Sequence, residues 1–493
     1  MKKILCLCMV IFIASMSMLY SCGGSKNSDN SDNSGVSDNS ADYEDIQEET
    51  PKDIAYEYGG EKIDFNGETF TVLYPNWALY VDYYFAEEET GDAVNDALYK
   101  RMVSAEEFFN IKFQTRMPGY IETIAPETRK EVLSGTNSFD IALTHCVSGL
   151  DAIVSQNLAY NWAKMPNVDF SKKYWNTSLN ENLTINDYMP FVANDFIIPD
   201  PCFITFSKDL LREYGLENPY EIVKSGKWTW DKMNEMAKQV SRDLDGDGQY
   251  TDKDLYGFVG ELDWMFVNAM YACDQYLMKK ETDGSYILDV NTPKTQVIVE
   301  KLYDLLYVGT QSFPYEYNAQ VNGKPYIPFD SGRALFYLST PSYVRDLRAT
   351  EFDFGILPYP KFDEAQEKYV ILNWAGTICA PLNISNPEKV GAVVEYLGAK
   401  SHEIVKPVYF DILLNSKLTR DDESKEMLDI IYGESIYDFG LNFSAFNELL
   451  YIVPKLLQAK STDLMSFYEK RAPRIQIQYD KIYNAYIANS EEW

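Results

Sequence analysis

Strand-like and helix-like patterns alternate along most of this sequence, and this alternation constrains the fold most. Phe70, Val72 and Tyr74 repeat with the period of a strand, and apolar residues within 94–109 follow helical spacing. Further strand patterns lie at 111–113, 139–144, 203–206 and 257–259, and helical patterns at 121–133, 210–214, 265–276, 387–397, 423–431 and within 463–487. Such alternation favours βαβ units, a mainly parallel sheet and an α/β fold, with ligands at the carboxyl ends of strands.

The N-terminus has the features of an export signal. Lys2 and Lys3 precede an apolar stretch from Ile4 to about Met18, shorter than the ~20 residues of a membrane-spanning helix. Residues 19–23, Leu-Tyr-Ser-Cys-Gly, resemble a bacterial lipobox. We expect residues 1–21 to be a lipoprotein signal peptide and Cys22 to carry the acyl chains, palmitate among them, that anchor the protein in the membrane. A plain signal peptide with a chance cysteine is the alternative.

Residues 22–60 predict a disordered acidic tether behind that anchor. Ser, Asn, Asp and Gly dominate its first half, and an acidic stretch follows at 42–49. Such a segment cannot bury enough apolar surface to fold.

The acidic composition disfavours two classes of binding partner. The 493 residues include 75 Asp and Glu against 44 Lys and Arg, a formal net charge of −31. Contacts to nucleic-acid phosphates, or charge-driven docking on anionic lipid, need clustered basic residues, so we expect neither. Aromatic residues make up 15% of the chain.

Four cysteines remain in the body once the signal and Cys22 are set aside. They are widely separated and lack a C-x-x-C spacing, so both disulfides and buried free thiols stay open. They are Cys146, Cys202, Cys273 and Cys379.

One loop has the spacing of a calcium site. Acidic residues occupy positions 1, 3, 5 and 12 of residues 243–254, with Gly at position 6. A strand pattern follows instead of a second helix, so we expect a structural Ca²⁺ and not a sensor; the alternative is an acidic surface loop. The expected ligands are Asp243, Asp245, Asp247, Gln249 and Asp254.

Enzyme motifs are mostly missing. The chain has two histidines, His145 and His402, and no G-x-S-x-G, P-loop or G-x-G-x-x-G. We expect no enzyme activity and no organic cofactor, although a pair of acids could still hydrolyse glycosides.

Several motifs together resemble the carbohydrate-type solute-binding lipoproteins of ABC importers, the family that includes maltodextrin-binding proteins. In chain order they are F-D-I-A-L-T (139–144), F-S-K-D-L-L (206–211), G-K-W-T-W-D (226–231) before the acidic loop and Y-G-F (256–258), F-D-S-G-R-A-L-F (329–336) and F-G-I-L-P-Y-P (354–360). Ser207 departs from the Asn that is usual in the second motif.

The resemblance implies a periplasmic-binding-protein-like type II fold, in which two α/β lobes joined by hinge crossings close on a solute. It implies a first lobe of residues 61–200 and 371–425 and a second lobe of 201–370 and 426–493. The crossings would fall near 194–206, 369–375 and 418–438. A monomer on the outer face of the cell membrane would deliver its solute to ABC permease subunits, with no nucleic-acid partner.

The predicted ligand-binding residues combine flat aromatic rings with polar groups, as a sugar requires. The resemblance places Trp264 after a strand, with Asp263 beside it, and Tyr343 after a helix near Gly332. Trp374 and Asn373 lie beside a crossing, Trp77 follows the first strand, and His145 and Ser148 follow the strand at 139–144.

Three other functions stay open. A surface glycan-binding lipoprotein of the helical-repeat type would be mostly helical. A secreted glycoside hydrolase would need two carboxylates at catalytic separation. The same fold binding a peptide or organic anion would place a cation such as Arg333 or Arg345 in the cleft.

Overall fold

The computed structural model describes residues 63–77, 84–315, 320–321, 324–325, 328–347, 352–374, 376–415, 422–433 and 435–493. The signal peptide, Cys22 and tether predicted for residues 1–60 lie outside these residues. Within them, no helix is long and apolar enough to cross a membrane.

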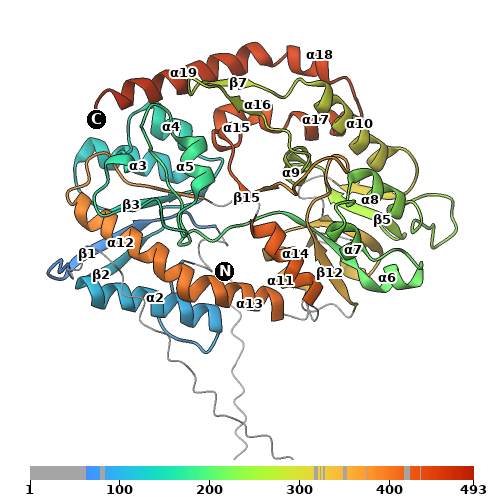
Figure 1. Ribbon diagram of the computed structural model, residues 1–493, viewed down its shortest axis with the longest axis horizontal. Coiled ribbons are helices and arrows are strands. Elements are labelled where there is room, and N and C mark those ends of the chain that lie inside the picture. The colour runs from blue at the N-terminus through green and yellow to red at the C-terminus, as the bar shows by residue number, and fades with distance from the viewer. Residues whose placement is uncertain are drawn as a thin grey trace, which may run out of the picture. The chain divides into compact units, whose positions relative to one another are not determined.

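The first lobe is built on a four-stranded sheet of order β14-β3-β1-β2 (Figure 1). The strands are β1 (Glu68–Leu73), β2 (Ile111–Arg116), β3 (Ile141–Thr144) and β14 (Thr377–Cys379). β1 runs parallel to both β2 and β3, with Phe70 opposite Phe113, and only β14 runs the other way. The helices of this lobe are α2 (Ala93–Phe109), α3 (Ile124–Ser134), α4 (Leu150–Ser155), α5 (Thr177–Leu183), α12 (Pro387–Lys400) and α13 (Lys406–Asn415).

Local signals explain the bounds of α2. The Asp92 side chain accepts hydrogen bonds from the backbone N–H groups of Val94 and Asn95, at 3.1 and 3.0 Å, and so caps the first turn. The helix ends where Asn110 adopts a left-handed conformation with φ of 49°.

The second lobe is built on a five-stranded sheet of order β12-β4-β11-β5-β8. Its strands are β4 (Phe203–Ser207), β5 (Tyr256–Glu261), β8 (Ser312–Tyr315), β11 (Ala334–Ser339) and β12 (Phe354–Leu357). Only β4 runs against its neighbours, so the predicted mainly parallel arrangement is confirmed in both sheets. The helices are α6 (Lys208–Glu213), α7 (Pro219–Lys224), α8 (Trp230–Ala237), α9 (Trp264–Ala272), α10 (Pro293–Tyr307), α11 (Pro341–Asp346) and α14 (Asp422–Gly433), and β6 (Met278–Lys280) pairs with β7 (Tyr286–Leu288).

The three predicted crossings lie side by side and are hydrogen-bonded to one another. β13 (Ile371–Leu372) pairs with β15 (Ser435–Ile436), and Asn373 pairs with Pro201. The Asn373 N–H donates to the Ile436 carbonyl at 3.0 Å, and the Asn373 Oδ1 accepts from the Asp200 N–H at 3.2 Å. The expected fold, two α/β lobes joined by hinge crossings, is therefore confirmed. β4 and β14 each follow a crossing, so they enter their sheets from the edge where the parallel strands end.

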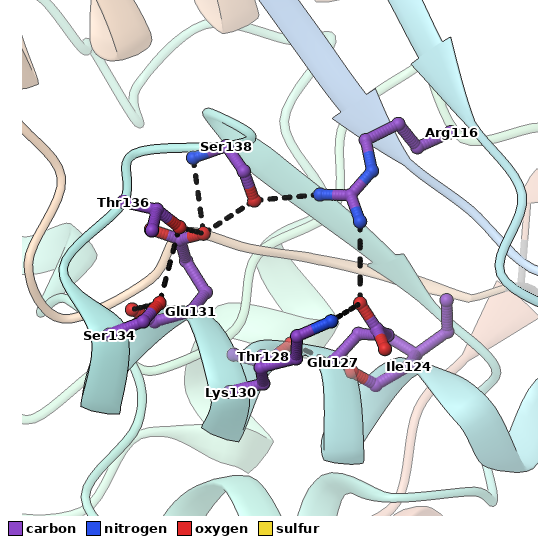
Figure 2. Close-up of polar contacts among 9 residues, drawn as sticks. All are labelled: Arg116, Ile124, Glu127, Thr128, Lys130, Glu131, Ser134, Thr136 and Ser138. Atoms are coloured by element: carbon purple, nitrogen blue, oxygen red, sulfur yellow. Dashed lines mark hydrogen bonds and ion pairs between the residues drawn. The ribbon is translucent and has the colours of Figure 1, made fainter.

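A polar network fixes the loop that leads into β3 (Figure 2). The Glu131 Oε2 accepts from the backbone N–H and the hydroxyl of Ser138, at 3.1 and 2.5 Å, and from the Thr136 hydroxyl at 2.9 Å. Burial alone would raise the pKa of Glu131, but these hydrogen bonds outweigh it and hold the pKa below its usual value. Arg116, at the end of β2, donates to the Ser138 hydroxyl at 2.7 Å and bridges to Glu127 at 3.3 Å. The network thereby ties the end of β2 to the loop before β3.

The C-terminal segment, which the resemblance places in the second lobe, packs on both lobes. It forms α15 (Phe439–Asn442), α16 (Asn447–Leu450), α17 (Ile452–Gln458), α18 (Leu464–Glu469) and α19 (Ala472–Ser490). α17 packs on α9 and α10, but α19 packs on α4 of the first lobe (Figure 1). The Tyr486 hydroxyl donates to the Leu183 carbonyl at 3.0 Å, and the Asn489 amide donates to the Val154 carbonyl at 2.9 Å.

Two further expectations are corrected or decided. The segment near Gly332 is not helical: a 3₁₀ turn (Pro328–Ser331) leads through Gly332, at φ of 71°, directly into β11. The four cysteines of the body are buried free thiols and form no disulfides with one another.

Candidate functional site

A cavity of about 410 Å³ lies between the lobes, where strands of both sheets end. This size is within the range of small-molecule sites. Trp77 follows β1, Tyr120 follows β2, His145 follows β3, and Glu261 ends β5, so the carboxyl ends of four strands converge on it. The lining consists of Trp77, Tyr120, Ile121, His145, Val147, Asp200, Glu261, Asp263, Trp264, Trp374 and Tyr451.

Three stacked rings form the wall from the first lobe. The Trp77 indole lies over the Tyr120 ring, with centroids 5.4 Å apart and an interplanar angle of 20°. The His145 ring packs on Trp77 at 4.7 Å. Its Nδ1 accepts from the Val147 N–H at 3.3 Å, and burial lowers the pKa of His145 to about 4. His145 is therefore neutral at physiological pH and adds no positive charge.

Two tryptophans at right angles form the wall from the second lobe and the crossing. The rings of Trp264 and Trp374 meet edge to face, with centroids 5.6 Å apart and an interplanar angle of 85°. The Trp374 indole N–H donates to the Asn268 Oδ1 at 3.0 Å, which fixes this ring. The cavity thus has flat apolar surfaces on both of its sides.

Three carboxyl groups share the cavity with these rings. Glu261 is only 8% exposed, and its Oε1 is buried without a hydrogen-bond partner in the described structure. Burial and then the Asp263 charge raise the pKa of Glu261 to about 7, against a hydrogen bond from the Trp264 side chain. The Oδ1 of Asp200 is likewise buried and unpartnered, and burial raises the pKa of Asp200 to about 7. Burial also raises the pKa of Asp263, with Lys455 opposing it.

Five of the eight ligand-binding residues predicted from the sequence line this cavity. They are Trp77, His145, Asp263, Trp264 and Trp374.

The other three predicted residues lie outside the lining. Tyr343, in α11, packs on the Tyr337 ring at 4.6 Å and donates its hydroxyl to Asp330. Asn373 is buried behind Asp200 and holds its backbone, as described above. Ser148 forms the turn with His145, its N–H donating to the His145 carbonyl at 3.3 Å.

Four polar or aromatic residues of the lining were not predicted from the sequence: Tyr120, Asp200, Glu261 and Tyr451. Tyr120 and Glu261 stand at strand ends, so the rule that placed Trp77 and His145 there also applies to them. Tyr451 comes from the C-terminal segment, and no local signal links it to the cavity.

The acidic loop brings three of its five predicted ligands together. One carboxylate oxygen from each of Asp243, Asp245 and Asp247 lies within 4.8 Å of the others. Asp254 is not part of this group: both of its oxygens accept backbone N–H groups, from Leu244 at 2.9 Å and Thr251 at 2.7 Å. These bonds lower the pKa of Asp254. Gly246 and Gly248, at φ of 73° and 81°, supply the turn.

Solved structures with a similar fold include two that are named as ABC substrate- or solute-binding proteins. An ABC substrate-binding protein from Listeria monocytogenes in complex with cycloalternan matches 84% of this chain and 98% of its own, with 13% identity and a TM-score of 0.51. An ABC transporter solute-binding protein from Thermotoga lettingae bound with α-D-tagatose matches 85% and 100%, with 14% identity and a TM-score of 0.50. UspC of M. tuberculosis matches 84% and 100%, with 13% identity and a TM-score of 0.54.

Sequence comparison adds no family: no family model and no curated protein matches the chain. The fold itself is that of the ABC solute-binding proteins, of periplasmic-binding-protein-like class.

Proposed function

We propose that this chain is the solute-binding component of an ABC importer and captures a sugar or oligosaccharide between its lobes. The observation that carries the proposal is the cavity in which Trp77 from one lobe and Trp264 from the other accompany buried carboxyl groups. It lies where hinge closure would bury a solute from both sides. The two neighbours whose names state a ligand hold carbohydrates in the same fold.

The lining suits a sugar chemically. A sugar ring has an apolar C–H face, which flat indole rings can cover. Its rim carries hydroxyl groups, which can donate hydrogen bonds to carboxylate oxygens. Trp77, Trp264 and Trp374 provide the first surface, and Asp200, Glu261 and Asp263 provide the second.

The alternatives fit less well. The two sheets are incompatible with a helical-repeat protein. An organic anion would need a cation, and no Lys or Arg is among the described residues that line the cavity. The glycoside hydrolase alternative is tested directly, because a hydrolase would cleave a glycan that the cavity binds.

A thermal-shift screen of the purified protein tests this proposal. Mono- and oligosaccharides, short peptides and organic anions are each added at millimolar concentration. At least one sugar is expected to raise the unfolding midpoint, because a ligand that binds only the native state stabilises it by mass action. A shift with peptides or anions and none with sugars would contradict the carbohydrate assignment.

We further propose that Cys22 is acylated and tethers the protein to the outer face of the cell membrane. The wild-type protein is expected in the membrane fraction and its Cys22→Ser variant in the soluble fraction, because the acyl chains are the only anchor proposed. Cys8→Ser, within the signal, is the matched control and should stay membrane-bound. Membrane retention of the Cys22→Ser protein would refute the anchor.

We also propose that the loop of Asp243, Asp245 and Asp247 binds a structural Ca²⁺. Adding Ca²⁺ after EDTA treatment should raise the unfolding midpoint of the wild type but not of the Asp245→Asn/Asp247→Asn variant. Asparagine keeps the oxygens that accept the N–H groups of residues 247 and 249, so only the charge is lost. Equal midpoints of the wild type with and without Ca²⁺ would exclude the site.

A further inference from the structure

The cavity carries more negative charge than its own surroundings balance. Asp200, Glu261 and Asp263 line it, and the described lining contains no Lys or Arg. His145 adds no charge, because burial lowers its pKa to about 4 and keeps the ring neutral. Lys455 acts on Asp263, the more exposed of these acids, and among the described residues no cation acts on Asp200 or Glu261.

Two carboxylate oxygens are unpartnered inside this site. The Oδ1 of Asp200 and the Oε1 of Glu261 are buried and make no hydrogen bond within the described structure. Both groups also act on the buried Cys202 thiol, so they lie in one neighbourhood. An unpaired buried acid is costly, and nearly all such groups in proteins have a partner. Because both side chains line the cavity, a solute bound there can supply a partner for these acids.

We propose that the solute carries a protonated amine, as in an amino sugar, and that Glu261 and Asp200 bind this ammonium group. The inference rests on the proposed function and names the class of sugar. An ammonium group offers three N–H donors and one positive charge, so it can pair with these acids and offset the charge of the site.

The aromatic walls are compatible with that cation. Tryptophan faces attract ammonium groups as well as sugar C–H groups, and four large rings surround the carboxyl groups. A neutral sugar would bring hydroxyl donors but no charge, so the two acids would have to stay protonated or remain uncompensated.

Titration calorimetry with matched sugar pairs tests the inference. The probes are D-glucosamine, D-galactosamine, D-mannosamine and the 1→4-linked glucosamine disaccharide, each beside the parent with hydroxyl in place of amine. At pH 7, where the amine is protonated, we expect at least one amino sugar to bind about tenfold or more tightly than its parent, the range of a charge-assisted hydrogen bond. Equal binding of every pair, tighter binding of the parents, or no binding of any amino sugar would overturn it.

Isosteric variants test whether Glu261 and Asp200 cause the preference for the amine. In Glu261→Gln and Asp200→Asn the amine preference should fall to about twofold or less, since the shape is kept and the charge is lost. Glu364→Gln, on an exposed loop, is the matched control and should keep the preference. A preference that survives both cavity variants would also overturn the assignment.

The preference should also depend on pH. Free Glu261 and Asp200 hold protons up to about pH 7, and binding an ammonium must release them, so the advantage of the amine should shrink between pH 7 and pH 5.5, a range in which an amine with a pKa of about 8 is itself protonated. Apart from Asp263, the titratable groups that interact with these two acids stay neutral across this range, because burial raises their pKa values. They are Tyr84, Cys146, Cys202, Tyr315, Tyr337 and Tyr359. An advantage that grows toward pH 5.5 would contradict the inference.

The two proposals fail differently. If neutral sugars bind and amino sugars show no advantage, the amine inference is wrong and sugar capture stands. If no sugar of either kind binds, both are wrong.

Discussion

Replacing Trp264 with alanine is expected to weaken sugar binding by about 30-fold or more, while the protein stays folded. Truncating a central tryptophan at a binding site typically costs about 2 kcal/mol or more, which is a factor of about 30 in affinity. Trp264 begins α9 at the mouth of the second lobe and meets Trp374 edge to face. Its loss would remove a flat wall of the cavity. Titration calorimetry with the sugar identified by the screen measures the effect.

Two controls separate binding from folding in that experiment. Trp264→Phe keeps an aromatic face and should recover most of the affinity. Trp493→Ala removes a partly exposed tryptophan that packs on Tyr160 at 4.6 Å, outside the cavity lining, and should bind as the wild type does. Wild-type affinity in Trp264→Ala would rule out this ring as a binding surface.

The free protein is expected to lose stability as the pH rises from about 4 to about 7, and Asp200 and Glu261 should cause much of this loss. Their pKa values rise to about 7 on folding, so in this window the folded state holds protons that the unfolded state has released. The unfolding free energy therefore falls as the pH rises. One pKa unit corresponds to about 1.4 kcal/mol, and we expect the pair together to account for about 2 kcal/mol or more.

Urea unfolding at pH 5 and pH 8 measures this effect. The Asp200→Asn/Glu261→Gln variant should lose less stability over this range than the wild type and be the more stable protein at pH 8, because unpaired buried charges are gone. Asp438, whose pKa burial raises to about 6, is unchanged in both proteins, so the difference reports the cavity pair. A variant with the same pH dependence as the wild type would show that these acids are ionised without cost.

Much of the site followed from the position of residues relative to strands. Trp77, His145 and Trp264 could be predicted because ligands of α/β proteins gather at strand ends. Glu261 was missed because it is the last residue of a fully buried strand and resembles a core position in the sequence. Tyr343, also expected in the cleft, lies outside the cavity lining, where its ring packs on Tyr337 and its hydroxyl donates to Asp330.

In the C-terminal segment, local sequence patterns predict where helices form but not the elements on which they pack. Pro473 separates α18 from α19 because proline fits the first turn of a helix but not its interior, so the single helix expected within 463–487 is two. The buried stripe of Ile475, Tyr479, Ile482 and Tyr486 has helical period and predicts α19. Helical periodicity identifies which face of α19 is buried but not the element that covers this face, so the packing of α19 on the first lobe could not be predicted.

The most direct test of the central claim, solute capture between the lobes, is a crystal structure of the protein with the sugar that the screen identifies. We expect the sugar ring in the cavity, in contact with Trp77 from the first lobe and Trp264 from the second, with a polar group on Glu261 or Asp200. A sugar bound at any other place, with this cavity left to water, would contradict the account.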